Sequence, residues 1–229
     1  MTVSRHPEMR VQRLHIGRES APLLVVDNFV ADPGELVELA ATKIFAQAPS
    51  YYPGLRAKAP LSYQRLVLED LRADIDAAFG LRGRVLRFTE CNFSLVTTPH
   101  EKLSYLQRIP HVDSLMNDEL AMIHYLFRAN HGGTAFYRHR STGYEYVDAS
   151  RQIEYMNRVE LEKAGPHAAP PAYILGDTPL YERIAAQDGI YNRLLMYRRT
   201  TLHSGSIAAD FAFDANPRTG RLSINAFLS

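Results

Sequence analysis

The sequence is poor in cysteine and carries almost no net charge. Cys91 is its single cysteine, so no internal disulfide forms, which favours a reducing compartment. A net charge of +1 over 229 residues excludes a global field that recruits nucleic acid or an anionic membrane. The arginines are scattered and form no basic stripe. We therefore expect no nucleic-acid partner and no membrane partner.

Long hydrophobic runs are also missing. No segment approaches the roughly 20 apolar residues that span a bilayer, and the first ten residues, MTVSRHPEMR, lack the apolar core of a secretory signal. Internal repeats, a phosphate-binding glycine loop, paired-cysteine zinc motifs and a nucleophile elbow are absent as well. These absences predict a cytoplasmic protein with one domain over residues 1–229, and they leave a homodimer open.

The N-terminal third (residues 1–80) predicts support elements. The β-branched run at 23–30 predicts a strand. Asp32 is typical of a helix N-cap, and a helix is expected over 33–47. Two prolines and a glycine at 51–60 predict a loop. Apolar residues then recur at every fourth position and predict a second helix: Val67, Leu71, Ile75 and Phe79. This helix is expected to end at Gly80, since glycine is typical after a helix C-terminus.

Residues 81–229 predict mainly strands. Helix signals are few, except for an expected helical insert near 149–164. Single strands are expected at 84–98, 120–127, 134–140 and 221–229, and a strand pair or one long bent strand is expected at 190–205. Helices followed by many short strands predict an α+β fold, with a β-sandwich or jelly-roll core buttressed by the N-terminal helices.

His111 and Asp113 are the first candidates for chemistry. They stand two positions apart in RIPHVDS, so in extended chain both side chains point to the same face and converge on one metal ion. The pair is weak by itself, because such spacings arise by chance and a surface turn explains it equally well. His203, at the end of a later apolar run, supplies a third ligand. A neutral imidazole with a carboxylate suits iron(II), manganese or zinc, and two histidines with one carboxylate form the iron triad that leaves coordination positions open.

Arg221 begins the last apolar run, GRLSINAFL, and Ser223 follows on the same strand face. A guanidinium is planar and permanently charged, and it therefore pairs with a carboxylate in a bidentate way. The alternative is an ordinary solvated arginine at a strand edge.

Taken in order, these motifs resemble a known family. The stretch HVD … MIHYLFRANHGGTAF … YNRLLMYRRTTLHSG … RLSINAFL is similar to the core of the prolyl-hydroxylase-like 2-oxoglutarate/iron(II) dioxygenases. The pattern consists of H-x-D, Tyr125-Leu126, a double glycine before Thr134, a distal histidine and a final-strand arginine. The ordered set is far more specific than any one motif.

The resemblance implies a double-stranded β-helix (jelly roll) core and a set of roles. The iron(II) ligands would be His111, Asp113 and His203, and Arg221 would anchor the cosubstrate 2-oxoglutarate. Ser223 and Tyr125 would assist Arg221, although a core aromatic also explains Tyr125. The implied reaction consumes O2 and hydroxylates an unactivated C–H of a small molecule, amino acid or peptidyl side chain, with succinate and CO2 as co-products.

The segment between His203 and Arg221 is longer than in close relatives of this family. We expect an inserted hairpin or loop that turns at Asn216-Pro217. If Arg221 does not reach the site, Arg198 or Arg199 would be the substitutes.

Two other functions compete with this hypothesis. A cupin-like metal enzyme would not use 2-oxoglutarate, and Arg221 with Ser223 argues against it. A non-catalytic jelly-roll binding protein is the other alternative, and the presence of all three metal ligands argues against it. The substrate is not identified by the sequence: Arg56 and Lys58 are candidates to meet an acidic group, or they are solvated loop charges.

Overall fold

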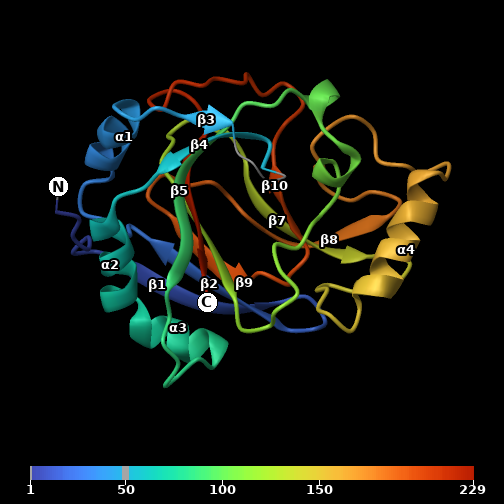
Figure 1. Cartoon of the computed structure of the whole chain (residues 1–229), viewed down its shortest axis with the longest axis horizontal. Coiled ribbons are helices and arrows are strands. Elements are labelled where there is room, and N and C mark those ends of the chain that lie inside the picture. The colour runs from blue at the N-terminus through green and yellow to red at the C-terminus, as the bar shows by residue number, and fades with distance from the viewer. Residues whose placement is uncertain (1, 48–51) are drawn as a thin grey trace.

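Two antiparallel β-sheets of unequal size form the centre of this computed structural model, which describes residues 2–47 and 52–229 (Figure 1). In order across the sheet, the eight strands of the large sheet are β1 (Arg10–Ile16), β2 (Ala21–Asp27), β9 (Leu194–Arg198), β6 (Leu120–Tyr125), β11 (Leu222–Leu228), β5 (Phe88–Val96), β4 (Gly54–Lys58) and β3 (Ala46–Gln47). The small sheet consists of β10 (His203–Ser206), β7 (Gly133–His139) and β8 (Tyr181–Gln187).

The helices lie on both sides of these sheets. Figure 1 shows three of them grouped at one side of the molecule and the fourth at the opposite side. The three are α1 (Pro33–Ala41), α2 (Leu61–Asp70) and α3 (Arg72–Phe79), and the fourth is α4 (Gln152–Lys163). Two short 3₁₀ turns, His100–Lys102 and Tyr105–Gln107, precede the H-x-D segment.

Side chains on the large sheet alternate between two faces, as strand geometry requires. The outer face packs against α1–α3 in one apolar cluster that includes Leu24, Phe93, Met122, Met196 and Ile224. The expectation that the N-terminal helices buttress the sheet is therefore confirmed. The inner face points to the small sheet, and Phe136 of β7 packs edge-on against Tyr197 of β9 with ring centroids 5.1 Å apart.

The inner face of the large sheet is divided into two halves of different chemistry. On β2, β9 and β6 it is apolar, and these side chains share one buried cluster with Phe136. On β11, β5 and β4 it is polar. We call this part the polar half, and it consists of Arg56, Lys58, Glu90, Asn92, Ser94, Arg221, Ser223 and Asn225.

Several local predictions are confirmed. Asp32 caps α1 by accepting a hydrogen bond from the Glu35 amide at 3.3 Å. Gly80 ends α3 in the left-handed conformation at φ 67°, which glycine adopts without steric cost. Ile190–Gly205 contains two strands, as expected, but they belong to different sheets.

Other predictions of secondary structure are wrong. The helix expected over 33–47 ends at Ala41, where Thr42 bonds back to the Leu39 carbonyl. The second helix is two helices, because the backbone leaves the helical region at Leu71 (ψ 0°). The expected loop at 51–60 contains β4, which pairs with β5; Tyr51 lies outside the described residues. The strands β1 and β8 were not expected, so strands precede the helices as well as follow them.

The long segment between β10 and β11 forms a loop that returns Arg221 to the large sheet. Its turn is at Asn216, whose carbonyl accepts from the amides of Thr219 and Gly220. Arg218 fastens the loop to α1 through an ion pair with Glu38 at 2.6 Å. The predicted turn at Asn216-Pro217 is therefore confirmed. In the described parts of the chain, no helix has the length and apolar character that crossing a membrane requires.

Candidate functional site

The structure brings His111, Asp113 and His203 together at the edge of the small sheet. His203 begins β10, and His111 forms an isolated antiparallel bridge with it through two backbone hydrogen bonds of 2.9 and 3.0 Å. The Asp113 amide donates to the Arg199 carbonyl at 2.8 Å. Backbone pairing therefore holds the H-x-D segment against the segment that leads into β10, and the ligand atoms of all three side chains lie within 4.8 Å of one another.

The three side chains are arranged around a shared point. The Asp113 carboxylate lies 3.7 Å from His111 Nε2 through one oxygen and 3.5 Å from His203 Nε2 through the other. His203 Nδ1 lies 2.9 Å from the Thr201 carbonyl, so this nitrogen carries the proton and donates it. Nε2 then keeps a free lone pair, which is the tautomer that a metal ligand needs.

The electrostatics of the site favour a neutral imidazole at His111. The surrounding protein partly desolvates the ring and lowers the pKa of His111 to about 4, the neighbouring His203 acts in the same direction, and Asp113 acts in the opposite direction. An unprotonated His111 is ready to bind a cation at neutral pH. Because its side chain is 48% exposed, this ligand lies on the solvent side of the site. Tyr197 packs against the opposite ligand, His203, with ring centroids 4.7 Å apart.

The donor set fits a divalent transition metal. Two imidazole nitrogens and one carboxylate occupy one side of such an ion, which is the arrangement that non-haem iron(II) sites use. The Asp113 backbone is fixed a second time, because its carbonyl accepts from Arg199 Nη2 at 2.8 Å. The residues present therefore fit iron(II).

Arg221 lies in the polar half of the inner face and is 3% exposed. It donates to the carbonyls of His131 at 2.9 Å and Gly133 at 2.8 Å. Among the described residues, no carboxylate forms an ion pair with it. A buried charge without a counter-ion is destabilising by several kcal/mol. An anionic ligand at this position would remove that penalty.

Arg221 and the three metal-ligand candidates are connected along β10. Gly205 stands two residues after His203, so the two positions face the same way about 6.6 Å apart. A Cβ added to Gly205 would lie 4.0 Å from Arg221 Nη2. Glycine therefore leaves space beside the guanidinium. A five-carbon dicarboxylate has the right length to reach from the metal position to Arg221.

Tyr125 and Ser223 lie beside Arg221, but their hydroxyls already have partners. Tyr125 Oη is 2.7 Å from Thr134 Oγ1, and the Arg221 guanidinium carbon is 5.9 Å from the centre of the Tyr125 ring. Ser223 donates to Asn225 Oδ1 at 2.6 Å. The two residues shape the surroundings of Arg221 without pointing a free hydroxyl at it.

The substitutes considered for Arg221 are engaged elsewhere. Arg198 donates to the carbonyls of Asn117 and Phe79. Arg199 forms an ion pair with Glu119 at 2.8 Å. Neither takes the place of Arg221.

Tyr52 is a candidate that the sequence did not reveal. Its hydroxyl is buried and has no hydrogen-bond partner in the described residues. Burial raises the pKa of Tyr52, whereas the nearby charges of Arg221 and Arg56 lower it. The guanidinium carbon of Arg56 lies 4.4 Å from the centre of the Tyr52 ring, and the charge of Arg221 also acts on the hydroxyl. Tyr52 is therefore a candidate donor to an anion bound at Arg221. Tyr52 belongs to a segment rich in proline and glycine, and no sequence motif marks it.

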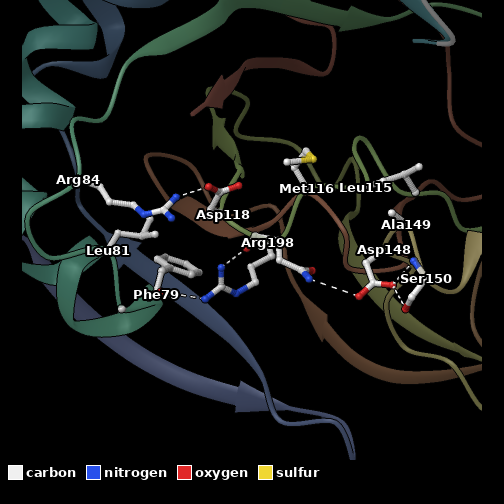
Figure 2. A pocket seen from close by; sticks show the side chains of 12 residues that line it. Phe79, Leu81, Arg84, Leu115, Met116, Asp118, Asp148, Ala149, Ser150 and Arg198 are labelled. Carbon is white, nitrogen blue, oxygen red and sulfur yellow. Dashed lines mark hydrogen bonds and ion pairs between the residues drawn. The ribbon is translucent and has the colours of Figure 1, made fainter.

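A surface groove lies away from these residues (Figure 2). Its volume is about 680 Å³, and it is formed by the end of α3 together with segments near Asp118 and Asp148. Figure 2 shows Arg84 paired with Asp118, and Asp148 bonded to Ser150. Arg198 is satisfied by backbone carbonyls, as described above. The charges of this groove are thus occupied by the protein itself.

The model of the family of unknown function DUF6445 matches residues 7–228. No curated protein matches the sequence. Among solved structures, HygX from Streptomyces hygroscopicus, with nickel, 2-oxoglutarate and hygromycin B bound, is 13% identical with a TM-score of 0.52, over 92% of this chain and 84% of that chain.

Two further structures have lower TM-scores. The non-heme alpha ketoglutarate dependent epimerase SnoN from nogalamycin biosynthesis is 14% identical with a TM-score of 0.48, over 86% of this chain and 70% of that chain. An N-substituted L-amino acid dioxygenase from Burkholderia ambifaria AMMD is 8% identical with a TM-score of 0.48, over 97% and 95%.

These identities are low, so the likeness to HygX shows the fold. HygX has been crystallised with iron as well as with nickel and 2-oxoglutarate. The His111, Asp113 and His203 group is consistent with iron(II), 2-oxoglutarate and O2.

Proposed function

We propose that this chain, which belongs to the family of unknown function DUF6445, is an oxygenase that uses iron(II) and 2-oxoglutarate. One observation carries the proposal. His111, Asp113 and His203 form a candidate metal group. Gly205, two residues after His203 on β10, borders the guanidinium of Arg221, which is buried and has no carboxylate partner among the described residues. A dicarboxylate chelated by the metal at one end would supply the missing anion at the other.

Each residue has a defined task in this proposal. His111, Asp113 and His203 would hold iron(II), and Arg221 would bind the far carboxylate of 2-oxoglutarate through charge-assisted hydrogen bonds. Tyr52 would donate a second hydrogen bond to that carboxylate, while Tyr125 and Ser223 would shape the space around it. When bound, the iron supplies O2 activation, by which 2-oxoglutarate becomes succinate and CO2 and a substrate C–H becomes C–OH.

The proposal extends to the fold, the branch of the superfamily and the class of substrate. We assign the two facing sheets to a double-stranded β-helix, or jelly roll, and the chain to the prolyl-hydroxylase-like branch of these oxygenases. The substrate would be a small molecule, an amino acid or a peptidyl side chain. The unpaired Arg221 favours this function over a cupin-like metal enzyme without 2-oxoglutarate, and over a non-catalytic binding protein.

An anaerobic titration tests the proposal. Metal-free protein receives iron(II) and then 2-oxoglutarate while visible absorption is recorded. We expect a weak charge-transfer band only when both are present, and no band in His203→Ala. Arg221→Ala should need roughly 100-fold more 2-oxoglutarate, because it loses a charge-assisted pair.

Tyr52 is tested in the same titration with a matched control. Tyr52→Phe should weaken 2-oxoglutarate binding about tenfold. Tyr137→Phe removes another buried hydroxyl without a partner in the described residues, but on β7 and away from Arg221, and should leave the affinity unchanged. Iron binding without any band would instead support the cupin-like enzyme, and no iron binding would support the non-catalytic protein.

A further inference from the structure

We infer that Arg56 and Lys58 form a binding site for an anionic group, a carboxylate or phosphate, on the substrate. That the bound molecule is a substrate rests on the proposed function. The site itself lies in the polar half of the inner face, and its binding of anions can be tested whether or not the protein is an oxygenase.

The two cations belong to rows of polar residues that cross the sheet. Arg56 is opposite Ser94, and Ser94 is opposite Ser223. Arg56 and Lys58 are two residues apart on β4, so both point to the inner face. The row of Lys58 continues through Asn92 and Asn225.

The positive charges of these rows are not balanced. Arg56 pairs through Nη1 with Glu90 at 3.2 Å, yet its Nε is buried without a partner in the described residues. Lys58 is exposed, and in the described chain it forms no ion pair. Glu90 is shared, because Asn92 also donates to it at 3.3 Å. Two cations therefore face one half-exposed carboxylate, and an excess positive charge remains.

The Arg56 end of this position adjoins Tyr52 and Arg221, whereas the Lys58 end lies toward the candidate metal group. Phe227 follows Asn225 on the same face of β11, and the Arg199 guanidinium lies 4.1 Å from its ring centre. Arg199 in turn bonds to the Asp113 carbonyl. The row of Lys58 and Asn225 is thus one two-residue step, about 6.6 Å, from Phe227. A molecule anchored there can extend toward the metal.

The chemistry of the rows defines the class of substrate. Arg56 supplies a planar donor to a carboxylate or phosphate, and Lys58 adds a mobile positive charge. The side-chain amides of Asn92 and Asn225 can form hydrogen bonds with uncharged hydroxyl or amide groups of the substrate. A polar molecule with one anionic group fits this face, and an apolar molecule does not.

Inorganic phosphate is the probe for this site. Protein is loaded with Mn²⁺ and N-oxalylglycine, an unreactive analogue that occupies the 2-oxoglutarate position and Arg221. The paramagnetic relaxation of ³¹P is then measured as phosphate is added. We expect saturable relaxation in the wild type, about tenfold weaker binding in the double variant Arg56→Gln/Lys58→Gln, and tighter binding in Glu90→Gln, which frees Arg56.

The control removes the same charge elsewhere. Lys43→Gln/Arg84→Gln, at exposed positions on other elements, should bind phosphate as the wild type does. Phosphate relaxation that persists unchanged in Arg56→Gln/Lys58→Gln, or that never saturates in the wild type, would overturn the inference.

A second measurement separates this inference from the proposed function. If Mn²⁺ does not bind, the proposed function fails and the relaxation signal is lost for that reason. Calorimetry then measures the heat of phosphate binding to the metal-free Arg221→Gln variant, in which Arg56 and Lys58 remain and Arg221 is removed. We expect Arg221→Gln to give a heat of phosphate binding, and we expect the triple variant Arg221→Gln/Arg56→Gln/Lys58→Gln to give none. The absence of any heat in Arg221→Gln itself would overturn the inference.

Discussion

Two buried arginines differ in how their charge is compensated. Arg138 is 8% exposed and forms ion pairs with Glu145 and Glu182. Arg221 is 3% exposed and bonds only to backbone carbonyls. Where a buried guanidinium serves the fold, as at Arg138, this chain provides carboxylates. The absence of one beside Arg221, within the described residues, therefore points to a ligand that brings its own negative charge.

His124 illustrates a different role for a buried polar residue. It stands next to Tyr125 but points to the outer face, and its ring nitrogens lie 3.1 Å from Tyr63 Oη and 3.1 Å from Asn192 Oδ1. Burial lowers the pKa of His124 from 6.5 to about 4. The imidazole is therefore neutral in the folded protein at every pH above that value.

This shift predicts how stability depends on pH. Above pH 6.5 His124 is neutral in both states, but between pH 6.5 and about 4 only the unfolded state takes up the proton. The free energy of unfolding should fall over this range by about 3 kcal/mol. Urea unfolding at several pH values measures it. His111, whose pKa is also lowered to about 4, adds a second contribution over the same range. His124→Gln should therefore remove the His124 contribution and leave that of His111, whereas the exposed control His167→Gln should retain both. Equal slopes in all three proteins would contradict the assignment.

At the scale of elements, β4 depends on a close approach of two backbones. A Cβ on Gly54 would overlap the Leu95 carbonyl oxygen of β5. That carbonyl cannot move away without disturbing the pairing of β4 with β5. The strand that carries Arg56 and Lys58 therefore requires glycine at its first position.

We predict unequal effects for two glycine substitutions. Gly54→Ala should lower the free energy of unfolding by about 2–3 kcal/mol, since the overlap involves backbone. Gly80→Ala should lower it by about 1 kcal/mol, because only the left-handed φ opposes alanine and the space is open. Urea unfolding compares the two. Mn²⁺ affinity should be retained in both, as neither strand β4 nor α3 carries a metal-ligand candidate; equal costs would argue against the close approach at β4.

At the scale of the whole molecule, the candidate metal group joins segments that are far apart in the sequence. His111 and Asp113 lie between β5 and β6, whereas His203 begins β10 of the small sheet. A metal bound to all three would connect the small sheet to the segment that enters the large one. Such a metal binds the folded protein and not the unfolded chain, and so it must stabilise the fold.

The stabilisation can be measured directly. At a free Mn²⁺ concentration 100 times the dissociation constant, the free energy of unfolding should rise by about 2.7 kcal/mol. Asp113→Ala should abolish this increase, while His167→Ala, at an exposed position outside the group, should preserve it. A metal-dependent increase that survives in Asp113→Ala would place the metal elsewhere.

The sequence by itself determined the features that depend on near neighbours. The spacing of His111 and Asp113, the N-cap at Asp32 and the glycine at the end of α3 are encoded within a few residues. The order of the motifs, with His203 and Arg221 after the H-x-D pair, also predicted that the three metal-ligand candidates meet. Their ligand atoms do lie within 4.8 Å of one another.

The tertiary structure alone decided which polar groups meet. Pairing with β5 made a strand of the proline- and glycine-rich segment at 54–58, and it brought Arg56 and Lys58 onto the inner face. Packing buried the hydroxyl of Tyr52 without a partner in the described residues and set its ring against Arg56, while the hydroxyls of Tyr125 and Ser223 found partners in Thr134 and Asn225. These outcomes depend on the register between strands that are distant in sequence, and no local pattern specifies that register.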